Sequence, residues 1–502
     1  MRREDYHKMD NQHKKTKQHG QVFTPKYLVE EMLDYAGYQG VSIIGKHIMD
    51  NSCGNGAFLQ SIITRYCEAA VSTNQRASDA RQELERFIHG IDTDANALQQ
   101  CRENLDRIAQ SYGIGQVKWD LHHENALHAE RFNNKMDFVV GNPPYVRVHN
   151  LGLSYAEVKQ GQFTQRGMTD LYLAFFKLGL NMLSPKGKLC YITPSSWLGS
   201  IAAREMRQYI LQEQNLVSLT DLGHFQAFKN ATAYTIISLF AKSKHDKHFD
   251  YYTFDETTCK RTFRNSISLE DCCIDNCFYL ADANRLKWLR EIKSKGTPQY
   301  VLVKNGLATL ADKVFIGNDI PNSNITIRAL KASTGKWYRC LFPYDKAGKL
   351  LPPATALADN AVASHLESHK TQLLKGRKED ATFYAYGRTQ ALADVWKPKL
   401  AVNTLIRTEK DLKIELAKAG EAVYSGLYIT CAPSIPLESI QNILTDKSMT
   451  EYVKLLKKYK SGGYYTFNSK DLQQYINYSL THQTTKDYAE QQYFFEEDSR
   501  LF

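Results

Sequence analysis

Short apolar runs alternate with amphipathic stretches through the first half of the chain. The apolar runs end at glycine, proline or aspartate, as buried strands do, and the amphipathic stretches repeat apolar residues at helical spacing. The predicted strands are 48–50, 87–92, 138–140, 189–193 and 233–240, and the predicted helices are 25–36 and 170–183. This alternation predicts an α/β fold with a doubly wound, mostly parallel sheet that helices cover on both faces.

The second half of the chain has a less regular pattern. Residues 246–300 are polar and mixed, which favours a linker that leads into a helix near 285–295. Residues 301–502 show short strands and turns with helices between them, which predicts an α+β domain. Residues 1–20 are polar and basic and favour a mobile arm, which precedes a first domain over 21–245.

The strand predicted over 138–140 leads into Asn142-Pro143-Pro144-Tyr145, where we expect the chemistry. The prolines fix φ and lack an N–H, so they stiffen the loop and leave the Asn142 side chain and the Pro143 carbonyl as preset acceptors. Adjacent acceptors suit an NH2 group, because accepting both hydrogens of an aromatic amine draws its nitrogen toward an attacking geometry. Tyr145 offers a ring for stacking. An ordinary turn is the alternative interpretation.

A second loop, from Asp50 through Cys53 to Gly56, follows the first predicted strand. Gly54 and Gly56 permit close backbone approach, as in nucleotide-binding turns at the carboxyl edge of a doubly wound sheet. Asp50 is placed to bind the amino-acid end of a ligand, and Asp92, at the end of the next predicted strand, is placed to hold ribose hydroxyls. A lone Gly-x-Gly is a weak signal, and the two acids strengthen it.

Two more candidate positions flank these loops. Thr24 is a good N-cap and Pro25 a good first residue for the helix predicted over 25–36, which by itself indicates a capped surface helix. Phe228 lies in a loop before the strand predicted over 233–240, where an aromatic ring most often belongs to the core.

Composition and charge narrow the class of protein. At 502 residues with 43% hydrophobic and 24% charged residues, the chain is long enough for two domains with cores. It has no apolar run long enough for a membrane span and no apolar signal-peptide segment, so we expect a cytoplasmic protein. Residues 241–502 hold 38 Lys and Arg against 30 Asp and Glu, which is most of the net charge of +10. A basic second half is compatible with phosphate binding or with a solvated surface.

The run from Asp137 to Arg147 resembles the catalytic motif of amino-methyltransferases that use S-adenosylmethionine, a group that includes adenine-N6 DNA methylases and glutamine methylases of release factors. The order of cofactor helix, cofactor loop, catalytic loop and long trailing domain is similar to the TaqI and Eco57I families of restriction-modification systems. The resemblance covers about residues 18–475 and implies a seven-stranded methyltransferase sheet over 21–245, with a DNA specificity domain over 301–502.

The resemblance also implies roles for individual residues. Asn142 and the Pro143 carbonyl would accept the hydrogens of an adenine N6 group, and Tyr145 and Phe228 would sandwich the base. The cofactor would be held by Thr24, Asp50, Cys53, Gly54, Gly56, Asp92 and Asn142, together with an acceptor for its adenine amino group. The family usually has an acid at that last position; here Asn125 aligns best, with Glu124 as the fallback.

The implied activity is methylation of a flipped-out adenine in duplex DNA, which protects the site from a separate cognate restriction endonuclease. The scheme requires no metal, and we expect a monomer. Rival interpretations are a methylase of RNA or protein glutamine, and a recognition subunit of a larger restriction or defence complex that uses the pocket only to sense cofactor. A cytosine-N4 methylase is less favoured, because that class usually carries Ser or Asp where this chain has Asn142.

Overall fold

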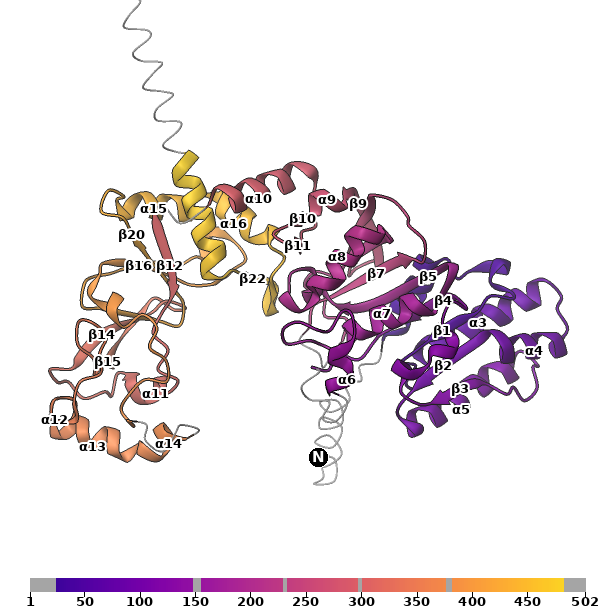
Figure 1. Ribbon diagram of the computed structural model, residues 1–502, viewed down its shortest axis with the longest axis horizontal. Helices are drawn as coiled ribbons and strands as arrows, with labels where there is room; N and C mark the ends of the chain where they lie inside the picture. The colour runs from indigo at the N-terminus through magenta and orange to yellow at the C-terminus, as the bar shows by residue number, and fades with distance from the viewer. Residues whose placement is uncertain (1–23, 148–154, 229–232, 297–299, 376–381, 483–502) are drawn as a thin grey trace, which may run out of the picture. The chain divides into compact units, whose positions relative to one another are not determined.

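The computed structural model describes residues 24–147, 155–228, 233–296, 300–375 and 382–482. The predicted arm over residues 1–20 lies outside this part of the chain. The chain divides into two compact units, residues 1–286 and 287–502, and the division falls within helix α10 (Ala283–Lys295) (Figure 1). Each unit is described by itself.

Unit 1 is built on a nine-stranded sheet of order β3-β2-β1-β4-β5-β7-β6-β8-β9. The pairs from β3 through to β5 are parallel, as is β6 with β8, whereas β7 runs antiparallel to both β5 and β6 and β9 runs antiparallel to β8. The strands are β1 (Ile48–Asp50), β2 (Ile88–Asp92), β3 (Asp120–His123), β4 (Met136–Gly141), β5 (Leu183–Pro194), β6 (Leu216–Asp221), β7 (Thr235–Ala241), β8 (His248–Asp255) and β9 (Lys260–Ser268).

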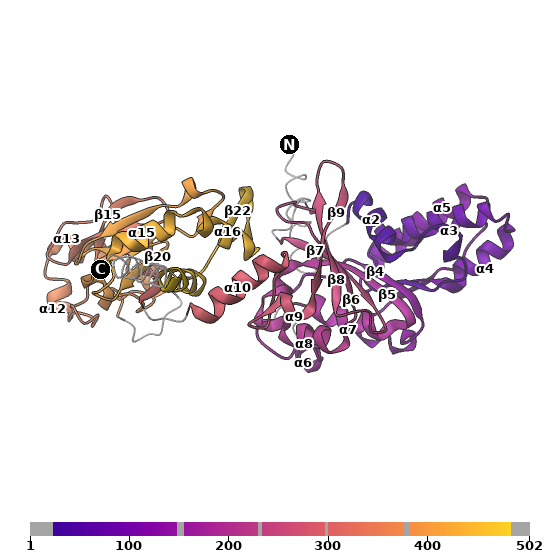
Figure 2. The same ribbon diagram turned by 90° about the horizontal axis from the view of Figure 1, so that it is seen from above.

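Helices lie on both sides of this sheet, with α2 to α5 on one side and α7 and α8 on the other (Figure 2). Their bounds are α2 (Lys26–Ala36), α3 (Ala57–Ser72), α4 (Ala77–Phe87), α5 (Ala95–Ser111), α6 (Tyr155–Gln160), α7 (Tyr172–Met182), α8 (Arg204–Glu213) and α9 (Leu269–Cys272). Helix α2 turns Leu28, Val29, Met32 and Leu33 into the core, as its apolar spacing predicts.

The predicted α/β fold with a mostly parallel sheet is confirmed, and the observed sheet is larger than expected. Seven strands, β3 through β6 in spatial order, form the expected sheet, and β8 and β9 extend it at one edge. These two strands come from residues 246–300, which were predicted to be a linker. The polar side chains that favoured a linker lie on a hairpin whose outer strand, β9, is exposed along most of its length, so the pattern of a buried strand is missing there.

Unit 2 contains three smaller sheets, β12-β20-β16-β18, β13-β15-β14-β19 and β17-β22-β21. All their pairs are antiparallel except β14 with β19, so the predicted α+β second domain is confirmed as a fold. The strands are β12 (Val301–Asn305), β13 (Ile316–Gly317), β14 (Thr326–Lys331), β15 (Lys336–Leu341), β16 (Lys399–Val402), β17 (Leu405–Ile406), β18 (Ile414–Ala417), β19 (Ala422–Tyr424), β20 (Leu427–Cys431), β21 (Tyr459–Lys460) and β22 (Tyr464–Thr466).

The labelled helices that lie wholly in unit 2 have nine residues or fewer. They are α11 (Asp312–Phe315), α12 (Pro353–Ala356), α13 (Asn360–Ser368), α14 (Lys370–Leu374), α15 (Leu437–Thr445) and α16 (Lys447–Leu455), and residues 469–482 are also helical. A separate buried cluster that includes Phe315, Leu341, Phe342 and Tyr386 forms a core of this unit. Unit 2 therefore has apolar packing of its own, as a second domain requires.

Candidate active site

Three of the predicted site segments follow neighbouring strands of the large sheet. Strand β1 ends at Asp50, β2 ends at Asp92, and β4 ends at Gly141, directly before Asn142. Because β1 pairs in parallel with both β2 and β4, the carboxyl ends of the three strands meet at one edge. We call this the carboxyl edge, and it is where ligands bind in open α/β sheets.

The predicted cofactor loop and the predicted catalytic loop touch at this edge. A Cβ atom at Gly141 would lie 2.8 Å from Asp50 Oδ1, so the Asp50 carboxyl occupies the space that a side chain at position 141 would need. Ser52 Oγ donates a hydrogen bond to the carbonyl oxygen of Asn142 over 3.4 Å. The fold therefore joins the two loops, which are about 90 residues apart in sequence.

Both acids of the edge are desolvated. Asp50 is buried, its Oδ1 accepts from the Ser52 N–H at 3.1 Å, and burial raises its pKa to about 8. Asp92 accepts from the Gly54 N–H at 2.7 Å and from the Asp94 N–H at 2.8 Å, and burial also raises its pKa. Burial disfavours a carboxylate without a cationic neighbour, so this edge attracts a ligand that brings positive charge.

The two glycines of the cofactor loop differ in their surroundings. Gly54 has a φ of 52°, and a Cβ atom there would have no neighbour within 4 Å, which leaves its backbone open to a ligand. Gly56 has a φ of 87°, and a Cβ there would lie 2.7 Å from Cys101 Sγ. Cys53 is buried, and a hydrogen bond with Cys101 together with burial raises its pKa. Its thiol thus belongs to the core, and its backbone is what remains for the predicted cofactor contact.

Asn142 and Tyr145 are held by their surroundings. The Oδ1 atom of Asn142 is fully buried at the end of β4. The Tyr145 hydroxyl donates to the Ile192 carbonyl at 3.1 Å, and burial raises the pKa of this phenol. Its ring also meets Tyr172 edge to face, with ring centres 6.3 Å apart. The loop after β4 is therefore tied to β5 and α7, as a stiff Pro143-Pro144 segment allows.

Phe228 lies beside Tyr145 as predicted, but the two rings do not form parallel plates. Their centres are 6.2 Å apart and their planes meet at 67°, an edge-to-face contact. Phe228 is buried in the core cluster of this unit. A base can enter between the rings only if one of them turns, so the predicted sandwich is not preformed.

The two candidates for the adenine acceptor of the cofactor have other partners. Asn125 Oδ1 accepts from the Leu127 N–H at 3.1 Å and caps a short 3-10 helix. Glu124 forms an ion pair with Arg131, and the hydrogen bonds from that guanidinium lower the pKa of the carboxyl. A carbonyl or carboxylate oxygen has a second lone pair, so either residue keeps capacity to accept.

Thr24 is buried ahead of helix α2, but it is not the N-cap. Pro25 occupies that position, and no side chain caps the helix. The predicted boundary was wrong by one residue, because Pro25 takes an extended ψ of 143° and the helix begins only at Lys26.

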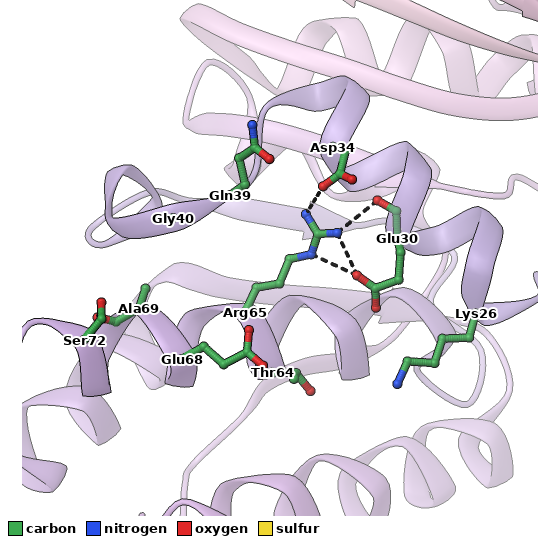
Figure 3. A pocket seen from close by; sticks show the side chains of 10 residues that line it. All are labelled: Lys26, Glu30, Asp34, Gln39, Gly40, Thr64, Arg65, Glu68, Ala69 and Ser72. Carbon is green, nitrogen blue, oxygen red and sulfur yellow. Dashed lines mark hydrogen bonds and ion pairs between the residues drawn. The ribbon is translucent and has the colours of Figure 1, made fainter. Parts of the chain in front are cut away.

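Arg65 of α3 fixes the outer side of α2. It donates to the Glu30 carboxylate at 2.7 Å, to Asp34 at 2.7 Å and to the Tyr38 carbonyl at 2.9 Å. Arg65, Glu30 and Asp34 line a surface pocket of about 550 Å³ (Figure 3), which includes none of the loop residues of the carboxyl edge. We interpret it as a gap between two helices, since Arg65 at its centre already forms ion pairs with Glu30 and Asp34.

Sequence reasoning missed several polar residues that build the edge. Ser52 bonds to the catalytic loop, and the Tyr191 hydroxyl of β5 donates to Asn51 Oδ1 at 2.8 Å in a fully buried contact. Ser52 and Asn51 stand inside the predicted cofactor loop, which is the signal that could have found them. Tyr191 lies in an apolar strand, where nothing in the sequence separates it from the core.

Neither a membrane-spanning helix nor a metal-binding cluster occurs in the described part of the chain. No helix among residues 24–147, 155–228, 233–296, 300–375 and 382–482 is long and apolar enough to cross a bilayer. Within the same ranges, no group of three or more His, Cys, Asp or Glu side chains is arranged to hold a metal ion.

Comparison with known proteins finds DNA methyltransferases among the relatives of this chain. Residues 59–228 match the model of the Eco57I restriction-modification methylase family. The type II methyltransferase M.BstVI of Geobacillus stearothermophilus is 27% identical over 241 residues, which is 46% of this chain and 43% of that protein. The type II restriction enzyme and methyltransferase RM.Eco57I of Escherichia coli is 23% identical over 549 residues, which is 86% of this chain and 54% of that protein.

One solved structure extends the likeness to both units. The type IIL restriction-modification enzyme MmeI, determined in complex with DNA, matches 88% of this chain and 63% of its own with a TM-score of 0.60 and 12% identity. At this identity the match concerns the fold. The chain spans about half the length of the first relatives named above. The resemblance predicted from the motifs is confirmed for residues 59–228, which match the Eco57I family model, and the relatives named above are distant ones.

Proposed function

We propose that the chain transfers a methyl group from S-adenosylmethionine to N6 of an adenine in duplex DNA, since residues 59–228 match the Eco57I family of restriction-modification methylases. The observation that carries the proposal is the contact between the loop after β1 and the loop after β4, through Asp50 with Gly141 and Ser52 with Asn142. This contact brings a cofactor-type loop and an amine-binding loop to one edge of the sheet. Protection of the methylated site from a restriction endonuclease is the biological role we propose.

The residues at the carboxyl edge fit S-adenosylmethionine. This cofactor carries an ammonium group, which Asp50 would bind, and ribose hydroxyls, which Asp92 would hold; burial raises the pKa of both carboxyls. The open backbone at Gly54 leaves room for close approach, and Thr24, Asn125 or Glu124 complete the proposed set. When bound, the cofactor supplies an electrophilic methyl group.

The chain's own residues bind and orient the target amine. Asn142 Oδ1 and the Pro143 carbonyl accept the two N6 hydrogens, which localises the nitrogen lone pair for attack. Tyr145 provides one stacking surface, and Phe228 provides a second once the edge-to-face contact opens. Stacking at about 1 to 3 kcal/mol per aromatic contact offsets part of the few kcal/mol needed to extrude a base.

We propose duplex DNA as the substrate on two grounds. MmeI was determined in complex with DNA, and its fold matches both units of this chain. Residues 241–502 also carry the larger part of the positive charge, as a surface that contacts phosphates requires. Unit 2 would then supply the target-recognition domain.

The test is methyl transfer by the purified chain. Labelled S-adenosylmethionine is incubated with plasmid DNA, tRNA or a protein extract, and the DNA is digested and analysed for N6-methyladenine by mass spectrometry. We expect label in duplex DNA, as N6-methyladenine within one sequence context. Label in tRNA or protein instead would support the rival substrates, and cofactor binding without turnover on any of them would support a recognition subunit.

A further inference from the structure

Two large apolar side chains stand out of the surface on the active-site side of unit 1. Ile201 is 77% exposed and Met168 is 72% exposed, the highest values for large hydrophobic residues among those the structure describes. They occupy neighbouring stretches of chain, because a Cβ at Gly167 would lie 3.6 to 3.7 Å from atoms of Ala202, and Arg166 forms an ion pair with Glu205. We call Met168 and Ile201 the apolar pair.

The loop that presents Met168 is rigidly built. The Lys159 ammonium donates to the Gln165 carbonyl at 3.3 Å, to the Gly167 carbonyl at 2.9 Å and to Thr169 Oγ1 at 3.4 Å. Thr169 is itself buried directly after Met168. The exposure of Met168 is therefore imposed by a fixed turn.

The loop that presents Ile201 is fixed by a buried arginine. Arg207 donates to the carbonyls of Trp197 at 2.5 Å, Ser200 at 2.8 Å and Asn276 at 2.5 Å. Burial lowers the pKa of this guanidinium, so a charged group is desolvated to hold the loop. Side chains displayed from fixed loops lose little entropy when they meet a ligand.

Both loops adjoin the catalytic loop. Arg147, two residues after Tyr145, forms an isolated antiparallel bridge with Asp170, two residues after Met168. The loop with Ile201 follows β5, whose carboxyl end lies beside that of β4. In this loop, Ser196 Oγ is 3.2 Å from the hydroxyl of Tyr172, and the ring of Tyr172 packs on Tyr145. The apolar pair thus belongs to the same edge as Asn142.

The charges around the apolar pair favour a polyanion. Arg147 is exposed at the end of the catalytic loop, and Arg166 is 60% exposed beside Met168. Glu205, the acid that pairs with Arg166, is mostly buried. Two apolar side chains flanked by exposed arginines fit a base stack bordered by phosphates.

We propose that Met168 and Ile201 form a wedge that enters the DNA stack at the position left by the extruded adenine. Methionine and isoleucine are among the side chains that proteins insert between base steps, and a filled gap limits the loss of stacking that opposes extrusion. The proposal rests on the proposed function, because the gap exists only if a base is flipped. A stable protein interface needs about 800 Å² per partner, far more than two side chains provide.

The test compares paired and unpaired targets. The double variant Met168→Ala/Ile201→Ala is assayed with a duplex oligonucleotide that carries the site found by sequencing methylated plasmid DNA, and with the same duplex containing an abasic site opposite the target adenine. We expect kcat/KM to fall about tenfold on the paired duplex, or about 1.4 kcal/mol, and to stay within about twofold of wild type on the abasic duplex. With 2-aminopurine at the target position, the fluorescence rise on binding should shrink in parallel.

A matched control removes two other exposed apolar side chains. Val41→Ala/Val71→Ala, at sites 57% and 62% exposed, should leave both rates unchanged. Ile201→Leu should keep most of the activity on the paired duplex, since it retains the apolar volume. Equal loss on paired and abasic duplexes, or no loss on either, would overturn the wedge while leaving the proposed function intact. Absence of any methylation by the wild-type chain would overturn both.

Discussion

The amino and carboxyl ends of the parallel strands, here called the amino and carboxyl edges of the large sheet, differ in how their polar side chains are paired. At the amino edge, His47 Nδ1 and His89 Nε2 are 2.8 Å apart, and His89 Nδ1 and Asp120 Oδ2 are 2.5 Å apart. Asp120 Oδ1 is also 2.7 Å from Nε2 of His122, which lies farther along β3. Each of these four side chains has a side-chain partner. At the carboxyl edge, the partners of Asp50 and Asp92 are backbone N–H groups.

The pKa values follow this difference. At the amino edge, burial would raise the pKa of Asp120, but its hydrogen bonds with His89 and His122 outweigh burial and lower it. At the carboxyl edge, burial raises the pKa of Asp50 and of Asp92. The acid at the amino edge is paired with histidines, whereas the two acids at the carboxyl edge have no cationic side-chain partner among the contacts described above. Acids with pKa values raised by burial are typical of functional sites.

The largest expected effect is that of Asn142→Ala at the carboxyl edge. Loss of the side-chain acceptor should lower kcat by about 100- to 1,000-fold, as removal of a positioned hydrogen-bonding group does in other enzymes. DNA binding, measured by a gel-shift assay on the cognate site, should stay close to wild type because contacts outside the pocket are retained. Full activity in this variant would refute the role of Asn142.

Gly141→Ala should be the next most damaging change. Its Cβ would lie 2.8 Å from Asp50 Oδ1 and would push the two loops apart, so we expect a loss of cofactor affinity of about tenfold, typical of overpacking at 1 to 3 kcal/mol. Titration calorimetry with S-adenosylhomocysteine measures it. Gly115→Ala is the matched control, since no atom lies within 4 Å of its Cβ position. Equal affinity in both variants would show that the contact with Asp50 is dispensable.

Asp50 should give cofactor binding a pH dependence. With its pKa raised to about 8, the carboxyl of the ligand-free chain holds a proton below that pH. An ammonium group favours the ionised carboxylate, so binding releases a proton, and affinity should rise as the pH increases from about 6 toward 8. Calorimetry across this range should show the slope in wild type and a flatter profile in Asp50→Asn. A flat wild-type profile would contradict the assignment.

His89→Phe at the amino edge should have the smallest effect on catalysis. The ring is kept, but His47 and Asp120 each lose a partner, so we expect a decrease of about 2 kcal/mol in the free energy of unfolding and a near-normal kcat in the folded protein. Urea denaturation measures the first quantity. The exposed pair of His248 with Asp246 provides the control, since water screens this pair and His248→Phe should leave the urea midpoint unchanged. A catalytic defect in His89→Phe would undo the contrast between the edges.

The pH dependence of stability sharpens the same contrast. Burial and the neighbouring His89 lower the pKa of His47, so the unfolded chain takes up this proton first as the pH falls below about 6.5. Stability should therefore decrease on acidification through that range. His47→Asn should weaken this decrease, measured as the urea midpoint at several pH values, whereas an unchanged profile would show that His47 does not control it.

The extension of the sheet illustrates where sequence patterns lose information. The apolar core residues of strand β5 lie within 189–193, where a strand was predicted, although the strand begins six residues earlier, at Leu183. Strand β9 exposes most of its side chains, so its pattern resembles that of a loop, and only hydrogen bonding to β8 makes it a strand. Edge strands are difficult to predict from sequence, because they form through hydrogen bonding to a neighbouring strand and their own residue pattern does not specify it.

The sequence by itself determined the α/β alternation, the two loops after β1 and β4, and the resemblance of residues 59–228 to the Eco57I methylase family. These features are local, since they depend on apolar periodicity and on residues such as Pro143 and Gly54 whose backbone preferences are intrinsic. Only the tertiary structure decided that the Asp50 carboxyl lies against Gly141, that Phe228 meets Tyr145 edge to face, and that Gly167, next to Met168, lies close to Ala202, next to Ile201. Each of these depends on the packing of segments far apart in the chain, which no stretch of sequence encodes alone.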